Sequence, residues 1–183
     1  MIVNSHNTAI SRVKSSKIAQ LILKSFDLSK YSSILDFGCG HGKDCQAYTD
    51  AGMSVEGYDK FYKPAFPDIK SNFDIVALTY VLNVIPDKLE RLLVLELAFF
   101  YVKPGGYLVV TTRTDHDIGR QAQKNNWDSF EDGYCSSMNR KTFQKGFKYD
   151  ELKELLISSL PIADIELMVN ESATLCFMVK KRG

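Results

Sequence analysis

The residues with the clearest chemical potential are an acid and three alternating glycines, Asp36, Gly38, Gly40 and Gly42. They follow a short apolar run, and a second acid, Asp59, ends the next apolar run. A glycine loop after a strand lets the backbone approach a ligand where any Cβ would clash. An acid about 20 residues beyond such a loop is well placed to accept hydrogen bonds from a ribose. The pattern therefore predicts a site for a ligand that contains a nucleoside.

The spacing of the glycines distinguishes between nucleoside ligands. The dinucleotide fingerprint G-x-G-x-x-G needs a third glycine at the position of Lys43, one residue beyond Gly42. The Walker phosphate loop, G-x-x-x-x-G-K-[ST], does not occur in the sequence. A dehydrogenase or a phosphate-loop protein is thus disfavoured, and the pattern that remains is D-x-G-x-G-x-G.

The segment from Asp36 to Gly42 resembles motif I of the class I S-adenosylmethionine-dependent methyltransferases. The resemblance implies that S-adenosylmethionine is the cofactor and that Asp59 holds the two ribose hydroxyls. It also implies that Asp36 and the loop face the positive amino group of the cofactor. A proline-glycine-glycine turn at residues 104–106, followed by an apolar run, is similar to the turn before the fifth strand of the same family.

The candidate site residues lie where predicted strands end. In open α/β sheets, ligands bind outside the carboxyl ends of the parallel strands. These ends fall at residues 36–42, 59–60, 79–83 and 113–116, and we expect them to converge on one cleft. The expected cofactor-binding residues are Arg12, Asp36, Phe37, Gly38, Cys39, Gly40, Gly42, Tyr58, Asp59, Lys60, Thr79 and Tyr80. The candidate catalytic residues are Tyr80 and Asn83, and no metal ligand is predicted.

Apolar periodicity predicts an α/β fold in a single domain, residues 1–183. Strands are expected at 33–37, 53–58, 73–79 and 107–112, and helices after Ser15 or Ser16 and at 43–51, 89–101 and 151–159. A strand, glycine turn, helix and strand form a right-handed crossover, so the sheet should be parallel there. Residues 162–169 and 173–181 predict a C-terminal antiparallel hairpin. The expected architecture is a Rossmann-like, doubly wound sheet that is mostly parallel.

The segment between Asp59 and the next predicted strand is shorter than in the usual methyltransferase core. Only residues 60–72 separate Asp59 from the next strand, and they include Pro64 and Pro67. The usual methyltransferase core has a helix, a third strand and another helix in this interval. We therefore expect strand three to be missing or reduced to an extended loop. Residues 61–72 must then hold the adenine, or the cofactor is held less tightly.

Two segments lie outside the predicted core. Residues 1–14 form a polar N-terminal arm, from which Arg12 could bind the cofactor carboxylate bidentately. Residues 115–148 are polar and irregular, and we expect a substrate-side insertion, since long loops in compact domains are usually functional or disordered. Asp115 and His116 could form an acid/base pair and Trp127 could stack on a base. Loop polarity and packing explain the same residues.

The sequence does not identify the molecule that accepts the methyl group. The segment at 80–87 lacks the [DNS]-P-P-[YFW] motif of nucleic-acid amino methyltransferases, and the chain contains no Pro-Cys dipeptide. Residues 8–12, the glycine loop, the short linker and residues 80–85 resemble methyltransferases associated with DNA phosphorothioation. The acceptor is therefore a nitrogen or oxygen atom of a nucleic acid or of a small molecule. A non-catalytic nucleoside-binding module is the alternative from another class.

Composition indicates a soluble globular domain. The net charge of +1 provides no global basic field to attract nucleic acid. The four cysteines lack C-x-x-C spacing, and we interpret them as thiols in a reducing cytoplasm. No stretch approaches the ~18 apolar residues of a membrane helix, so no membrane partner is expected.

Overall fold

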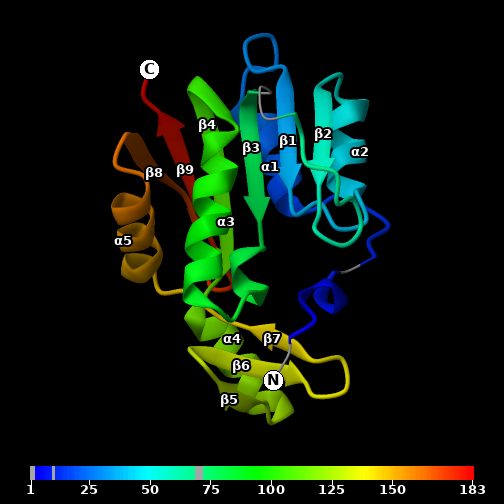
Figure 1. Cartoon of the computed structure of the whole chain (residues 1–183), viewed down its shortest axis with the longest axis vertical. Coiled ribbons are helices and arrows are strands. Elements are labelled where there is room, and N and C mark those ends of the chain that lie inside the picture. Colours follow the sequence, from blue (N-terminus) through cyan, green and yellow to red (C-terminus); the bar gives the residue numbers. More distant parts are fainter. Residues whose placement is uncertain (1–2, 10, 69–71) are drawn as a thin grey trace.

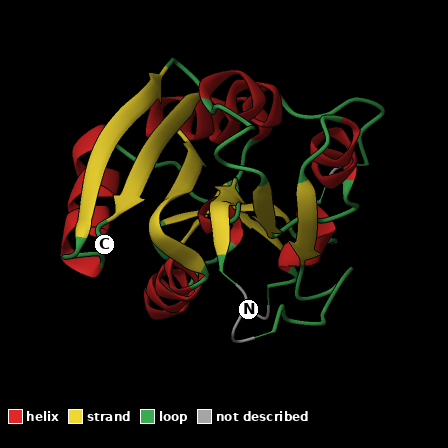
Figure 2. Cartoon of the chain, turned by 90° about the horizontal axis from the view of Figure 1, so that it is seen from above, coloured by secondary structure: helices red, strands yellow, loops and turns green. Residues whose placement is uncertain are grey.

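One six-stranded sheet with helices on both faces forms the body of the protein (Figures 1 and 2). The computed structural model describes residues 3–9, 11–68 and 72–183. The helices are η1 (Ser5–Thr8), α1 (Lys17–Ser25), α2 (Lys43–Asp50), η2 (Leu82–Val84), α3 (Lys88–Phe100), α4 (Asp115–Asn125) and α5 (Tyr149–Ser159). The strands are β1 (Ser33–Phe37), β2 (Ser54–Tyr58), β3 (Phe73–Thr79), β4 (Val102–Arg113), β5 (Asp128–Phe130), β6 (Gly133–Ser137), β7 (Thr142–Gln144), β8 (Ala163–Asn170) and β9 (Thr174–Lys181). Within these described ranges, no helix is long and apolar enough to cross a membrane.

The sheet has the strand order β2-β1-β3-β4-β9-β8. The first four strands run parallel, whereas β9 and β8 are antiparallel to their neighbours. The prediction of a mostly parallel sheet with a C-terminal antiparallel hairpin is therefore confirmed. The carboxyl ends of the four parallel strands lie together at one edge of the sheet, pointing toward the lower half of Figure 1.

The helices cover the sheet in two layers. On one face, α3 packs on the sheet through Leu95, and on the other face α1 packs through Ile22. Consecutive side chains of a strand point to opposite faces. Accordingly, Leu35 of β1 belongs to the first core and Ile34 to the second. The glycine loop after β1 is thus attached to a strand that is fully packed on both sides.

The interval after β2 is as reduced as the sequence predicts. In the described residues, β2 is the edge strand, and residues 59–68 form only an isolated bridge, between Asp59 and Lys63. Residues 69–71 of the expected linker, like residues 1–2 and 10 of the expected arm, lie outside the described residues. The Tyr101 hydroxyl at the end of α3 donates to the Pro67 carbonyl at 3.2 Å. The linker is therefore fixed to the end of α3 at Pro67.

The prediction of an irregular segment at residues 115–148 is wrong. The segment begins with α4 and continues into a second, three-stranded antiparallel sheet with the order β5-β6-β7, which we call the small sheet. Thr114 caps α4, because its hydroxyl accepts the Asp117 N–H at 3.1 Å. Strands of three to five residues are too short to show a clear alternation of apolar and polar residues. Their structure depends on pairing between segments that are not adjacent in sequence.

Strand β4 begins five residues earlier than expected, at Val102 instead of Tyr107. The proline-glycine-glycine turn lies inside it, and the pairing with β3 shifts register between Phe73 and Ile75. A Cβ at Gly106 would lie only 2.7 Å from the carbonyl oxygen of Asp74, so no larger residue fits there. The turn is thus an irregular start of the strand.

Two buried cations attach the small sheet to the main core. Arg91 of α3 donates to both carboxylate oxygens of Asp132, at 3.1 and 2.5 Å. Lys145 pairs with Asp132 at 3.4 Å and with Glu151 of α5 at 2.7 Å. Although burial opposes its ionisation, Asp132 has a lowered pKa because Arg91 and Lys145 stabilise the carboxylate. The small sheet is therefore held beside the carboxyl ends of the parallel strands.

Candidate functional site

A cavity of about 470 Å³ opens at the carboxyl ends of β1, β2, β3 and β4. Its walls come from the glycine loop, the turn after β2, η2 and α3, and residues of η1 and β7 complete the lining. The lining includes these sequence-predicted site residues: Arg12, Asp36, Phe37, Gly38, Cys39, Gly40, Tyr58, Asp59, Lys60, Thr79, Tyr80 and Asn83. Gly42 lies outside the lining, at the N-cap of α2. The expected convergence of the strand ends is therefore largely observed.

The glycine loop has a backbone that requires glycine. Gly38, Gly40 and Gly42 have φ angles of +93°, +51° and +76°, which other residues rarely adopt. The Gly38 N–H donates to the Tyr58 carbonyl at 2.7 Å, so the loop is tied to the end of β2. A Cβ at Gly38 would overlap the side chain of Val81. The loop can thus bring its backbone directly to a ligand.

Asp36 is a buried carboxyl group in the cavity wall, with 4% of its surface exposed. Burial raises its pKa to about 7, and the nearby charge of Asp44 adds to this effect. The Cys45 thiol donates to its carboxylate at 3.5 Å, and no salt bridge to Asp36 is formed in the described part of the chain. A buried carboxyl group without a positively charged partner suits a cationic ligand, which would supply the counter-charge. This fits the ammonium group that the sequence predicts here.

Asp59 organises the turn after β2. Its Oδ1 accepts the N–H groups of Phe61 and Tyr62, at 2.9 and 3.0 Å, and its Oδ2 accepts the N–H of Gly40 at 3.0 Å. Asp59 and Lys63 also exchange two backbone hydrogen bonds of 3.0 Å. The carboxylate therefore joins the glycine loop to the linker while it lines the cavity.

Two of the expected cations form ion pairs at the cavity. Arg12 lies 3.7 Å from Asp44, and Lys60 lies 3.3 Å from Glu90. Both pairs have partly exposed side chains, and exposed pairs contribute little to stability. The structure thus brings Arg12 of the arm to the cavity, and its role toward a cofactor carboxylate stays a prediction.

Tyr80 and Asn83, the candidate catalytic residues, both have protein partners. Tyr80 has a φ of +58°, and its hydroxyl lies 3.0 Å from Thr174 Oγ1 of β9. Asn83 is buried; its Nδ2 donates to the Lys145 carbonyl at 2.6 Å and its Oδ1 accepts the Arg113 N–H at 3.1 Å. Asn83 therefore joins η2 to β4 and to the end of β7. A catalytic role for either residue stays a prediction.

The linker and α3 supply an apolar part of the cavity. The Phe66 ring stacks on Tyr58, with centroids 4.1 Å apart and planes at 18°. Phe61, Leu93 and Leu97 also line the cavity. The linker was expected to take this position, but the sequence reasoning missed the wall that α3 forms. The sequence pattern that could have indicated this wall is the four-residue spacing of Leu93 and Leu97, which places both on one face of an amphipathic helix.

The polar lining also includes residues that were not expected. Gln144 of β7 and His6 of η1 line the cavity, although neither was assigned to the site from the sequence. Of the strand end at residues 113–116, only Arg113 lines it. Asp115 and His116 begin α4 and line a separate hollow, so the cleft does not include the proposed acid/base pair. Among the residues that the structure describes, no group of three or more His, Cys, Asp or Glu side chains could hold a metal ion.

Solved structures with this fold include several S-adenosylmethionine-dependent methyltransferases. One from Methanosarcina mazei is 17% identical, with a TM-score of 0.65 over 93% of this chain and 99% of that chain. A 1,6-didemethyltoxoflavin-N1-methyltransferase from Burkholderia thailandensis, bound to 1,6-didemethyltoxoflavin and S-adenosylhomocysteine, is also 17% identical. Its TM-score is 0.62 over 91% of this chain and 78% of that chain. The fold is therefore that of the class I methyltransferases.

The sequence also identifies the family. Residues 10–149 match the model of a family described as "Methyltransferase domain", so the chain belongs to that family. No curated protein sequence matches the chain. The expected class, a class I S-adenosylmethionine-dependent methyltransferase, is thus confirmed, and with it the enzyme assignment and the cofactor of that class.

Proposed function

We propose that this protein transfers the methyl group of S-adenosylmethionine to a nitrogen or oxygen atom of a small molecule. The observation that carries the proposal is the size of the cavity, to which η1 and Gln144 of β7 contribute lining residues. Both elements lie beyond the carboxyl ends of the strands (Figure 1). A volume of about 470 Å³ is typical of small-molecule sites, and it has to hold both reactants. A nucleic-acid strand would instead need an extended groove.

The lining residues suggest how the cofactor is oriented. Asp36 would face the amino group and Asp59 the ribose, as the family resemblance implies. The adenine would lie in the apolar part, near Phe61 and Phe66. Bound S-adenosylmethionine supplies an activated methyl group. The residues of the chain align the acceptor with it and exclude water, and such alignment is a major source of rate acceleration.

The charge of the cavity favours a small acceptor over a nucleic acid. Four basic and four acidic residues line it: Arg12, Lys43, Lys60, Arg113, Asp36, Asp44, Asp59 and Glu90. Nucleic-acid binding depends on neutralising phosphates with an excess of basic residues. The described lining residues carry no such excess. The narrower resemblance to methyltransferases associated with DNA phosphorothioation stays a prediction.

Calorimetric titration with S-adenosylmethionine tests the cofactor site. We expect the wild type to bind and the Asp59→Ala variant to bind at least tenfold more weakly. A tenfold loss of affinity is about the contribution of one hydrogen bond to a charged group. Asp50→Ala is the matched control, because Asp50 is an exposed residue at the end of α2. Absence of binding by the wild type, or undiminished binding by Asp59→Ala, would contradict the assignment.

Turnover tests the acceptor. The protein is incubated with methyl-labelled cofactor together with a small-molecule extract, DNA or RNA in separate reactions. Label in small molecules alone is the expected result. Label only in DNA or RNA would contradict the acceptor class. Cofactor binding with no transfer in any of the three reactions would favour the non-catalytic module.

A further inference from the structure

Cys39 and Cys45 form a pair of neighbouring thiols at the wall of the cavity. Cys39 belongs to the glycine loop and lines the cavity, and Cys45 lies in the first turn of α2. Both are free and only partly buried. A Cβ built on Gly57 of β2 would lie 3.1 Å from the Cys39 sulfur and 2.8 Å from the Cys45 sulfur. Because both sulfur atoms approach the same point so closely, they are near neighbours.

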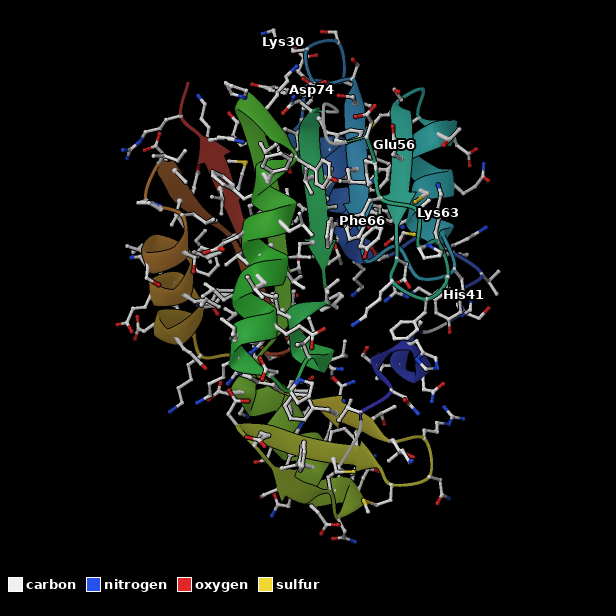
Figure 3. The ribbon with its side chains drawn as sticks, in the orientation of Figure 1. Lys30, His41, Glu56, Lys63, Phe66 and Asp74 are labelled. Atoms are coloured by element: carbon white, nitrogen blue, oxygen red, sulfur yellow. The ribbon has the colours of Figure 1, made fainter. Side chains whose placement is uncertain are left out.

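Gly57 provides the space that the two sulfur atoms occupy. It is not one of the glycines with a positive φ, so the backbone of β2 does not require glycine at this position. A glycine inside a strand weakens the strand, because it has no side chain to pack. Any Cβ here would overlap the Cys45 sulfur. Figure 3 labels Glu56, the neighbour of Gly57 on β2, and His41 at the outer side of the glycine loop.

The carboxyl group of Asp36 is in contact with this pair. The Cys45 thiol donates to Asp36 Oδ2 at 3.5 Å. The pKa of the Cys45 thiol is raised, first by its hydrogen bond to Cys39 and then by burial and by the charge of Asp36. A thiol reacts as its thiolate, so Cys45 needs a base to take its proton. Asp36 has a pKa of about 7, so a large fraction of it is ionised near neutral pH and can accept that proton.

We propose that Cys39 and Cys45 form a reversible disulfide when the protein meets a peroxide, and that this bond lowers the affinity of the cavity for S-adenosylmethionine. The formation of the bond is independent of the proposed function. Its effect on binding rests on the proposed binding of S-adenosylmethionine in the cavity.

The oxidation takes place in two steps. The Cys39 sulfur attacks one oxygen of the peroxide, the O–O bond breaks, and a sulfenic acid and one water molecule form. The Cys45 sulfur then attacks the sulfur of Cys39 and the S–O bond breaks. The proton of Cys45 passes through Asp36 to the leaving hydroxide, which departs as a second water molecule. Two thiols are thus oxidised to one disulfide while hydrogen peroxide is reduced to water.

The disulfide changes the part of the loop that faces the ligand. An S–S bond is about 2.05 Å long, so the sulfur atoms must move together, and Cys45 no longer has a proton to donate to Asp36. The Cys39 N–H donates to the Tyr58 carbonyl at 3.0 Å, and the Cys39 carbonyl accepts the Gly42 N–H at 2.9 Å. Tethering Cys39 to α2 strains this backbone. The neighbouring glycines of the loop line the cavity, so the cofactor loses contacts with them.

Peptide mapping tests the bond. Trypsin cleaves after Lys30, Lys43 and Lys60, so the two cysteines fall in separate peptides, 31–43 and 44–60. The folded wild type is treated with hydrogen peroxide, its remaining thiols are alkylated, and the protein is digested. We expect these two peptides to be linked, and the link to disappear after treatment with dithiothreitol. Absence of the linked peptides from the peroxide-treated protein overturns the inference.

Calorimetric titration with S-adenosylhomocysteine, the stable product form, tests the effect on binding. Peroxide should weaken binding by the wild type about tenfold, and dithiothreitol should restore it. Cys45→Ser keeps a hydroxyl that can donate to Asp36 but cannot form the disulfide, so peroxide should leave its affinity unchanged. Cys176→Ala is the control and should respond as the wild type does, because Cys176 is buried within the sheet. Thermal unfolding verifies that both variants are folded.

The outcomes separate the disulfide from the proposed function. Linked peptides with unchanged affinity overturn the inference, because the bond then has no effect on the cavity. The same loss of affinity in Cys45→Ser also overturns it, because another oxidised group then causes the loss. A reduced wild type that does not bind S-adenosylhomocysteine contradicts the proposed function itself, whereas the linked peptides decide the disulfide separately.

Discussion

Replacing Asp36 by asparagine tests the electrostatics of the cavity. Asp36 is buried in the cavity wall, and burial raises its pKa to about 7. Asparagine has nearly the same shape, and its amide oxygen can still accept the Cys45 thiol. The Asp36→Asn variant therefore removes the charge and leaves the packing largely unchanged.

The size of the effect follows from the pKa. The carboxyl group loses its proton near pH 3.8 in the unfolded chain and near pH 7 in the folded protein. Between these values the folded state retains a proton that the unfolded state has lost, so stability falls as the pH rises through the window. The full shift corresponds to about 4 kcal/mol of destabilisation above pH 7, of which about 1.5 kcal/mol is already present at about pH 5.

Urea unfolding of the ligand-free protein at about pH 5 and about pH 8 measures this difference. The Asp36→Asn variant should gain stability relative to the wild type, and the gain should be about 3 kcal/mol larger at the higher pH. The same variant should bind S-adenosylmethionine at least tenfold more weakly, because it cannot balance the ammonium charge. Asp50→Asn, at the exposed end of α2, should show no change between the two pH values. A gain for Asp36→Asn that is the same at both pH values would refute the reasoning.

Three further substitutions separate binding from folding. Gly38→Ala should abolish cofactor binding in calorimetry, because its Cβ would overlap Val81 and its φ of +93° disfavours alanine; retained affinity would contradict the geometry of the loop. Arg91→Met should cost about 3–5 kcal/mol in urea unfolding, since it leaves Asp132 without its bidentate partner; a cost below about 1 kcal/mol would mean that the pair does not anchor the small sheet. Asn83→Ala should lower the free energy of unfolding by about 2–3 kcal/mol, because two hydrogen bonds are lost. If turnover falls without that loss of stability, Asn83 is catalytic rather than structural.

The site residues that could be predicted from the sequence are those set by local geometry. A strand that ends in an acid and alternating glycines forces a loop with positive φ angles, and Asp59 ends the strand that pairs with it. The missing third strand was predictable by length alone, because too few residues follow Asp59 to build it. Local patterns were also sufficient to locate α3 on the sheet, though not to show that its leucines line the cavity.

Strand periodicity and the φ angles of glycine act within a few neighbouring residues, so the parallel sheet, the glycine loop and both acids could be predicted from the sequence alone. The cofactor was implied by the resemblance of that loop to a known family. The residues of η1 and β7 reach the cavity through tertiary contacts alone. The Asn7 side chain donates to the Arg140 carbonyl at 2.9 Å across 133 positions of the chain, and this contact holds η1 against the small sheet. The same folding buries Asp36 and delivers His6 to the cavity. Such contacts depend on the packing of distant segments, and no periodicity of the sequence records them.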